Sequence, residues 1–193
     1  MKVLMINGSR NEKGCTYTAL GIIAEALKAQ GIDSEIFFIG DKVLDGKINE
    51  TVMNAAELMK TADALIVGAP VYYASPSGEV EVFLDRFFGV ASKDLQYKPA
   101  AAVCSARRAG TTACIDALNK YFMISQMPVV SSTYWNMVHG NVPEEVLQDE
   151  EGVQIMRCLG RNMAWILKSI EAGKEAGVEQ PVAEKKIKTN FTR

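Results

Sequence analysis

The fold of this chain is indicated first by residues 3–18, which read VLMINGSRNEKGCTYT. Residues 3–6 form a short, wholly apolar run, which is typical of a strand that is buried on both faces of a parallel sheet. The run stops at a loop that begins with Asn7. Beyond this loop, apolar residues recur at helical spacing from Thr16 to Gln30, and the glycine that follows is a natural end for a helix. The chain is therefore predicted to open with a buried strand, a loop and a helix.

The same alternation continues along the rest of the sequence. Apolar runs predict four further strands, at residues 33–39, 64–69, 100–104 and 128–132. Capping residues and helical stripes predict four further helices, at residues 51–61, from Ser77 onward, at 113–125 and at 150–172. Because right-handed crossovers place the helices on both faces of a parallel sheet, the predicted class is a doubly wound α/β fold.

Composition indicates one globular domain and excludes several classes of partner. Residues 1–177 are predicted to form the domain, and residues 178–193 a charged tail on its surface or on a neighbouring subunit. The net charge of −2 provides no basic field for nucleic acid. No apolar run approaches the roughly 18 residues of a membrane span, and the first strand begins at Lys2, which leaves no room for a signal peptide. We therefore expect a cytoplasmic protein with neither nucleic acid nor membrane as a partner.

Cysteine and histidine are too few and too scattered for common metal sites. Cys15, Cys104, Cys114 and Cys158 show no Cys-x-x-Cys spacing, which disfavours zinc and iron–sulfur sites and supplies no disulfide framework. His139 is the only histidine, so a three-histidine zinc centre is excluded. The sequence predicts no metal site.

The loop after the first strand has the features of a phosphate site. Ligands of doubly wound sheets bind beyond the carboxyl ends of the strands, and residues 8–18 bring glycines, hydroxyls, an arginine and a helix N-terminus to that edge. Three other phosphate-binding motifs are disfavoured. A Walker loop needs lysine where Cys15 stands, and a dinucleotide fingerprint needs another glycine pattern. A receiver domain needs acidic residues at the end of the first strand. A phosphomonoester suits the loop, although Thr16 could also simply cap the helix.

Two later loops reach the same edge of the sheet. Residues 70–78 carry two prolines and paired tyrosines, which could cover the face of a flat heterocycle or could pack on the surface. Residues 105–112 carry two arginines and a glycine. If the flat heterocycle is a flavin, positive charge there would favour its reduced, anionic form. Alternatively, the two arginines are simply solvated side chains beside a helix.

Together these loops resemble the NAD(P)H-dependent FMN reductase family of flavodoxin-like proteins, whose relatives include iron–sulfur flavoproteins and multimeric flavodoxins. The resemblance spans nearly the whole chain. Its motif pieces are GSR at residues 8–10 with Thr16, GAPVYY at 68–73 and FLDR at 83–86. It implies a flavodoxin-like three-layer sandwich whose five-stranded parallel sheet has the order 2-1-3-4-5.

The resemblance also implies where one FMN would bind. The first loop would surround the phosphate, and the two later loops would border the isoalloxazine ring. The cofactor-binding residues expected on this basis are Ser9, Arg10, Cys15, Thr16, Tyr17, Pro70, Val71, Tyr72, Tyr73, Ser105, Arg107, Arg108 and Gly110. Cys15 stands where relatives often carry asparagine.

The sequence departs from the resembling proteins in one segment. Iron–sulfur relatives carry a cysteine cluster between the second and third strands, but residues 40–50 contain no cysteine, so we expect no cluster. Asp85 and Arg86 are expected to have structural roles. Residues 134–140 resemble the substrate-side loop of a reductase subgroup, although Trp135 and Met137 could instead belong to the core.

The resemblance implies an FMN-dependent oxidoreductase. Such an enzyme takes hydride from NADPH or NADH and reduces a small acceptor, namely a quinone, a nitroaromatic compound or a flavin, by a ping-pong mechanism, commonly as a homodimer or homotetramer. Because the flavin carries the chemistry, no catalytic side chain is assigned. One alternative is a flavodoxin-type carrier serving protein partners, disfavoured by the near balance of 21 basic and 23 acidic residues. Another is a cofactor-free interaction protein on the same scaffold.

Overall fold

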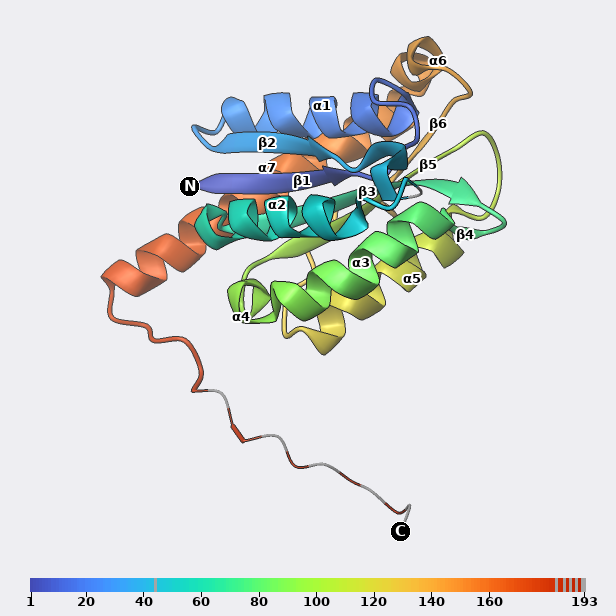
Figure 1. Ribbon diagram of the computed structural model, residues 1–193. Helices are drawn as coiled ribbons and strands as arrows, with labels where there is room; N and C mark the ends of the chain where they lie inside the picture. The colour runs from blue at the N-terminus through green and yellow to red at the C-terminus, as the bar shows by residue number, and fades with distance from the viewer. Residues whose placement is uncertain (44, 183, 186, 188, 190, 192–193) are drawn as a thin grey trace.

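A parallel sheet lies between two layers of helices in the computed structural model, which describes residues 1–43, 45–182, 184, 185, 187, 189 and 191 (Figure 1). Its parallel strands run in the order β2-β1-β3-β5-β6, and a short strand, β4, pairs antiparallel with the end of β3. The bounds are β1 (Lys2–Asn7), β2 (Asp33–Phe38), β3 (Ala64–Tyr72), β4 (Ser75–Pro76), β5 (Ala100–Ala106) and β6 (Met137–His139). This confirms the predicted class and the order of five parallel strands, to which the structure adds the hairpin strand β4.

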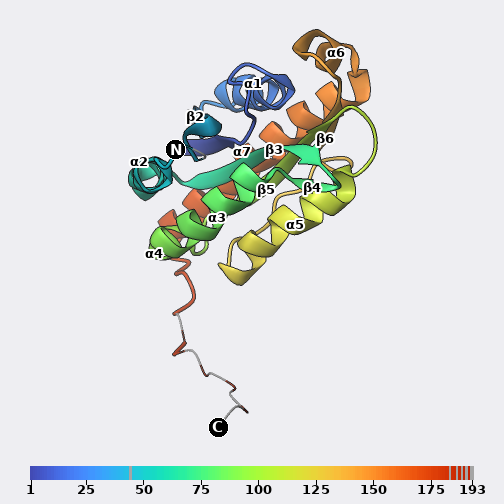
Figure 2. The same ribbon diagram turned by 45° about the vertical axis from the view of Figure 1, so that its right-hand side comes forward.

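The helices cover both faces of the sheet (Figure 2). One layer contains α1 (Cys15–Lys28) and α7 (Glu150–Glu175), whose buried residues share a core with Val3 and Met5 of β1. The other contains α2 (Ile48–Thr61), α3 (Gly78–Val90) and α5 (Thr111–Ile124), which pack on Leu4 and Ile6. The short helices are η1 (Gly40–Val43), α4 (Ser92–Leu95) and α6 (Pro143–Gln148). Successive residues of β1 thus point into opposite cores, as expected for a strand that is buried on both faces.

The packing of α1 against α7 depends on one close approach. A Cβ atom at Gly160 would lie 2.7 Å from the Cβ of Ala26 and 3.0 Å from the carbonyl oxygen of Ile23. Only glycine therefore fits at this crossing without a shift of one helix. The contact holds the long final helix against the helix that follows the first loop.

The predicted strand at residues 128–132 is wrong in its details. Only an isolated parallel bridge joins Val129 to Ala100, and the edge strand is β6, which pairs with Cys104–Ala106. The physical reason is that the serines after the bridge bind α7 instead of the sheet. Ser132 donates its hydroxyl to the carbonyl of Ile155 at 2.6 Å, and the carbonyl of Ser131 accepts from Asn162.

Two predicted helix caps also differ from the structure. Helix α2 begins at Ile48, so Thr51 lies inside its first turn, where its hydroxyl donates to the carbonyl of Lys47. Ser77 does precede α3, but its side chain forms no cap, and its buried hydroxyl has no partner among the residues that the structure describes. The backbone carbonyl of Ser77 instead accepts from Val80.

Beyond α7, residues 178–182 lead away from the sandwich (Figure 1). Helix α7 ends at Glu175, and Gly177 takes a left-handed conformation with φ of 83°. The division into a domain at 1–177 and a tail at 178–193 stays a prediction, and residues 183, 186, 188, 190 and 192–193 of that tail lie outside the described residues. Within the described part of the chain, no helix is both long and apolar enough to span a bilayer.

Candidate functional site

The loops that follow four parallel strands meet around one pocket at the carboxyl edge of the sheet. The cavity measures about 320 Å³ and opens between the loops after β1 and β3, where the strand order reverses. Residues after β5 and β6 complete its wall. Its lining consists of Ser9, Asn11, Gly14, Cys15, Thr16, Pro70, Val71, Tyr72, Ser105, Ala106, Arg107, Gly140, Asn141, Val142 and Pro143.

The loop at residues 8–14, here called the phosphate loop, is held by its own hydrogen bonds. Asn7 is fully buried at the end of β1, and its amide donates to the carbonyl of Glu12 at 2.9 Å and accepts from the N–H of Ser9 at 3.2 Å. The Ser9 hydroxyl then accepts from the N–H of Asn11 at 3.1 Å. The Gly14 N–H donates to the carbonyl of Asn11. The loop therefore has a defined shape before any ligand arrives.

The first turn of α1 presents free donors to the pocket. Helix geometry leaves the N–H groups of residues 15–17 without an acceptor inside the helix, and Gly14 provides no side-chain cap. The Thr16 and Ser105 hydroxyl oxygens lie 2.8 Å apart and are both buried. That bond uses one of their two hydroxyl hydrogens, which leaves the other for a ligand. Backbone N–H groups at a helix N-terminus, with a hydroxyl beside them, suit phosphate oxygens.

Cys15 is a neutral thiol at this helix N-terminus. Burial raises its pKa, and the carboxylates of Glu145 and Glu144 raise it further, against the lowering effect of a backbone hydrogen bond. Its sulfur donates to the carbonyl of Gly140 at 3.6 Å. The side chain therefore links the phosphate loop to the β6 side of the pocket and is not activated as a nucleophile.

The hairpin of β3 and β4 forms another side of the pocket. Tyr73 and Ala74 at its tip both have positive φ, at 51° and 60°, a conformation that costs energy for residues with a Cβ. Gly110 has φ of 99°, and a Cβ there would lie 2.9 Å from the Cα of Ala74 and 3.0 Å from Val71. Gly110 thus allows the loop after β5 to touch the hairpin, which is a packing role.

The loop after β6, residues 140–143, is a wall that the sequence analysis largely missed. Gly140 donates to the carbonyl of Ala106 at 3.0 Å, and the N–H of Asn141 donates to the Glu145 carboxylate at 2.7 Å. A Cβ at Gly140 would lie 2.8 Å from the backbone nitrogen of Val146. The signal for this wall was present as a glycine and a proline that closely follow an apolar stretch, but the strand had been placed too early.

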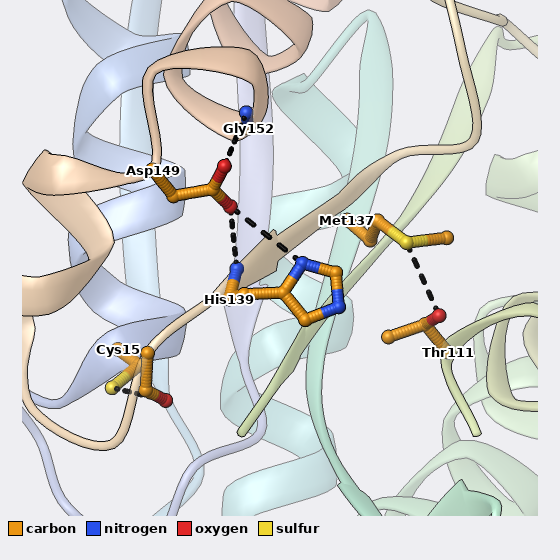
Figure 3. A network of polar contacts seen from close by, with 7 residues as sticks. Cys15, Thr111, Met137, His139, Asp149 and Gly152 are labelled. Carbon is orange, nitrogen blue, oxygen red and sulfur yellow. Dashed lines mark hydrogen bonds and ion pairs between the residues drawn. The ribbon is translucent and has the colours of Figure 1, made fainter. Parts of the chain in front are cut away.

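One carboxylate anchors the wall at residues 140–143 (Figure 3). Asp149 accepts from the backbone N–H of His139 at 2.7 Å and from that of Gly152 at 2.9 Å, so it joins the end of β6 to the start of α7. The His139 ring nitrogen Nδ1 lies 3.7 Å from the same carboxylate. On the other side of the strand end, the Thr111 hydroxyl contacts the Met137 sulfur at 3.1 Å. The arrangement positions Gly140 beside the phosphate loop.

The structure brings most of the predicted cofactor residues together and leaves some outside the cavity. Arg10 points outward, with Nε 3.5 Å from the Glu79 carboxylate, and Tyr73 is fully exposed at the hairpin tip. Trp135 is also exposed, whereas Met137 is buried in the core. The predicted residues that line the cavity are Ser9, Cys15, Thr16, Pro70, Val71, Tyr72, Ser105 and Arg107, and those that do not are Arg10, Tyr17, Tyr73, Arg108 and Gly110.

The chain matches a family of known proteins over most of its length. The family model described as NADPH-dependent FMN reductase matches residues 1–142. An iron–sulfur flavoprotein of Methanocaldococcus jannaschii is 28% identical, over 89% of this chain and 100% of that protein. A flavone reductase structure aligns with a TM-score of 0.68 at 19% identity, covering 89% of this chain and 64% of its own. The NAD(P)H:(acceptor) oxidoreductase FerB of Paracoccus denitrificans aligns with a TM-score of 0.64 at 13% identity, covering 87% and 97%. These two aligned structures have the same fold as this chain.

The described residues do not fit an iron–sulfur cluster. Such a cluster needs several thiolates around one point, but Cys15 lies on α1, Cys158 on α7, Cys104 on β5 and Cys114 on α5. Cys104 and Cys114 lie in the same buried core, where the neighbouring Cys114 thiol and burial raise the pKa of Cys104. Among the described residues, no group of three or more histidine, cysteine or acidic side chains could hold a metal ion.

Proposed function

The chain belongs to the NADPH-dependent FMN reductase family, and from this premise we propose that it binds one FMN in the carboxyl-edge pocket and reduces a small acceptor with hydride from NADPH or NADH. The acceptor class is a quinone, a nitroaromatic compound or a flavin. The observation that carries the proposal is the open N-terminus of α1 at the point where the strand order reverses.

The phosphate loop and α1 would hold the FMN phosphate. The backbone N–H groups of residues 15–17 and the spare hydroxyl hydrogen of the Thr16–Ser105 pair are the donors. Cys15 is neutral, so it adds no negative charge next to a phosphate dianion. Arg10 is largely exposed and would reach the phosphate only by leaving the more buried Glu79, a contact that is long at 3.5 Å.

The walls after β3 and β5 would hold the isoalloxazine ring. Pro70, Val71 and Tyr72 provide an apolar border, while Ser105 and Arg107 provide the polar one. When bound, FMN supplies the hydride-accepting and hydride-donating chemistry, and these residues orient it and limit access of water. For this reason we assign no acid or base to the chain.

We also propose a ping-pong order, in which donor and acceptor use the same exposed face of the flavin ring in turn. The pocket is open at the carboxyl edge of the sheet, between the loops after β1 and β3. We further propose that the enzyme is a homo-oligomer, as in the resembling family, and that it works in the cytoplasm. The four free cysteines agree with a reducing compartment.

An anaerobic flavin titration tests this function. Purified protein is first titrated with FMN, and NADPH or NADH is then added while the flavin absorbance is followed. We expect FMN to bind and the oxidised band to bleach rapidly, then to return when a quinone is added. If FMN binds but neither nucleotide bleaches it, the chain is an electron carrier for protein partners; if FMN does not bind, the assignment of the pocket is wrong.

A further inference from the structure

A second cavity lies at the opposite edge of the sheet, near the amino ends of the strands. It measures about 440 Å³ and is lined mainly by apolar groups. The C-terminal half of α7 provides Trp165, Ile166 and Ile170, and Pro128 and residues 178–181 provide the other walls. We refer to it as the Trp165 groove.

Large apolar side chains at the rim of the Trp165 groove are exposed to solvent. The Trp165 side chain is 70% exposed at its rim, and Val178 on the facing wall is 67% exposed. Large apolar side chains around an open groove are typical of surfaces that bind another polypeptide. The groove is distinct from the pocket at the carboxyl edge, because the two cavities share no lining residue.

The tail of the chain carries apolar side chains that its own body leaves uncovered. Val182 is 90% exposed, and Ile187 and Phe191 are each 94% exposed. The chain leaves the wall of the groove at Pro181, and Val182 beyond it is not covered by the body. The residue before a proline favours an extended backbone. Exposed apolar residues at intervals along an extended segment suit insertion into a groove.

Charge favours an attraction between the tail and the body. Residues 178–193 hold four lysine or arginine residues and two glutamates, a net charge of +2. Because the whole chain has a formal charge of −2, residues 1–177 carry −4. A basic, partly apolar segment is therefore attached to an acidic body, and opposite net charges steer such segments toward one another.

We propose that the tail of one copy of this chain docks in the Trp165 groove of a second copy, with Ile187 and Phe191 as anchors. The tail begins at the rim of its own groove, so a twofold axis beside this rim places each tail next to the groove of the other copy. The exchange is reciprocal and buries on each copy the apolar groups that the single chain exposes. It does not depend on FMN.

Sedimentation of the full chain with matched variants tests this assembly. We expect a concentration-dependent dimer whose dissociation constant rises at least about tenfold in Ile187→Glu and in Trp165→Ala. The controls are Thr189→Glu, which adds the same charge to the tail without removing an apolar group, and Trp135→Ala, which removes an exposed tryptophan elsewhere. A chain that is monomeric at hundreds of micromolar overturns the proposal, as does a dimer that all four variants preserve.

Fluorescence separates docking between copies from docking within one copy. Trp135→Phe leaves Trp165 as the only tryptophan, since the chain has two. We expect its emission to shift to shorter wavelength as protein concentration rises, and Ile187→Glu to abolish the shift. Emission that is already shifted at the lowest concentration and that Ile187→Glu changes in the monomer would show the tail in its own groove, which contradicts the exchange.

Discussion

Two of the walls of the pocket at the carboxyl edge, the phosphate loop and residues 140–143, are held in place by different kinds of contact. Apart from the Gly8 N–H, which donates to the carbonyl of Gly68 at 2.9 Å, the phosphate loop is held by bonds that join residues within a few positions of one another, as when Asn7 binds Ser9 and Glu12. The wall at residues 140–143 is held from a distance in sequence, by Cys15 of α1 and by Asp149 at the start of α7. The comparison suggests that the first wall determines affinity for the cofactor, whereas the second depends on the packing of whole helices.

Asn7→Ala should have the largest effect, because it removes the residue that shapes the phosphate loop. Its loss leaves the Ser9 N–H and the Glu12 carbonyl without partners near a buried position, so the free energy of unfolding should fall by about 3 kcal/mol. The dissociation constant for FMN should rise at least about tenfold. Urea unfolding and FMN titration measure both, and Asn54→Ala on the exposed face of α2 is the control. Unchanged FMN affinity would contradict the role of the loop.

Asp149→Ala tests the second wall. The substitution removes the N-cap of α7 and the anchor of His139, so unfolding free energy should fall by about 2 kcal/mol. FMN affinity should change only a few-fold, which distinguishes this wall from the first. Asp116→Ala, at an exposed position on α5, provides the comparison in the same unfolding and titration assays. A loss of affinity as large as that in Asn7→Ala would remove the distinction between the walls.

Thr16→Val should weaken FMN binding without a large loss of stability. Valine keeps the shape but loses the hydroxyl that bonds Ser105, so the expected cost is about 1 kcal/mol in FMN binding, roughly a fivefold rise in dissociation constant. Thr18→Val is the matched control, because its hydroxyl bonds only the Gly14 carbonyl. Equal effects of the two variants would show that the Thr16 hydroxyl does not face the phosphate.

Arg10→Gln should leave stability almost unchanged. The Arg10 side chain is 58% exposed and its contact with the more buried Glu79 is long, at 3.5 Å, so the free energy of unfolding should shift by less than about 0.5 kcal/mol. If the guanidinium turns to the phosphate when FMN binds, affinity falls a few-fold and the fall shrinks at high salt. Glu79→Gln, which releases Arg10, should raise affinity slightly; a drop would place the arginine away from the phosphate.

The rate at which the Cys15 thiol is alkylated should report whether FMN occupies the site. Because its pKa is raised, a smaller fraction is thiolate at a given pH, and alkylation should be slower than for a free cysteine and should speed up as pH rises. Cys158→Ser removes the other cysteine that is not fully buried. In this variant, bound FMN should slow the alkylation of Cys15 further. Mass spectrometry of the alkylated peptide measures the rate, and alkylation that FMN leaves unchanged would argue against phosphate binding at this helix.

The amino-acid sequence was sufficient for the first wall and for the architecture around it. The apolar run at residues 3–6, the loop and the helical stripe all lie within thirty residues, and their periodicity reflects local geometry. The doubly wound class followed because alternating strands and helices with right-handed crossovers allow few arrangements. The order of the strands came from the resemblance to flavodoxin-like proteins. The phosphate loop was recognisable since its donors are supplied by neighbouring residues and a helix N-terminus.

Tertiary structure alone decided the position of the last strand and the walls that depend on it. The apolar residues at 128–132 read as a strand, but their serines bind α7, and the chain rejoins the sheet only at Met137. No local pattern reveals that Asp149 fixes the end of β6 or that Gly110 permits contact with Ala74. These contacts join residues ten or more positions apart, and their energies depend on distances that exist only after the helices have packed.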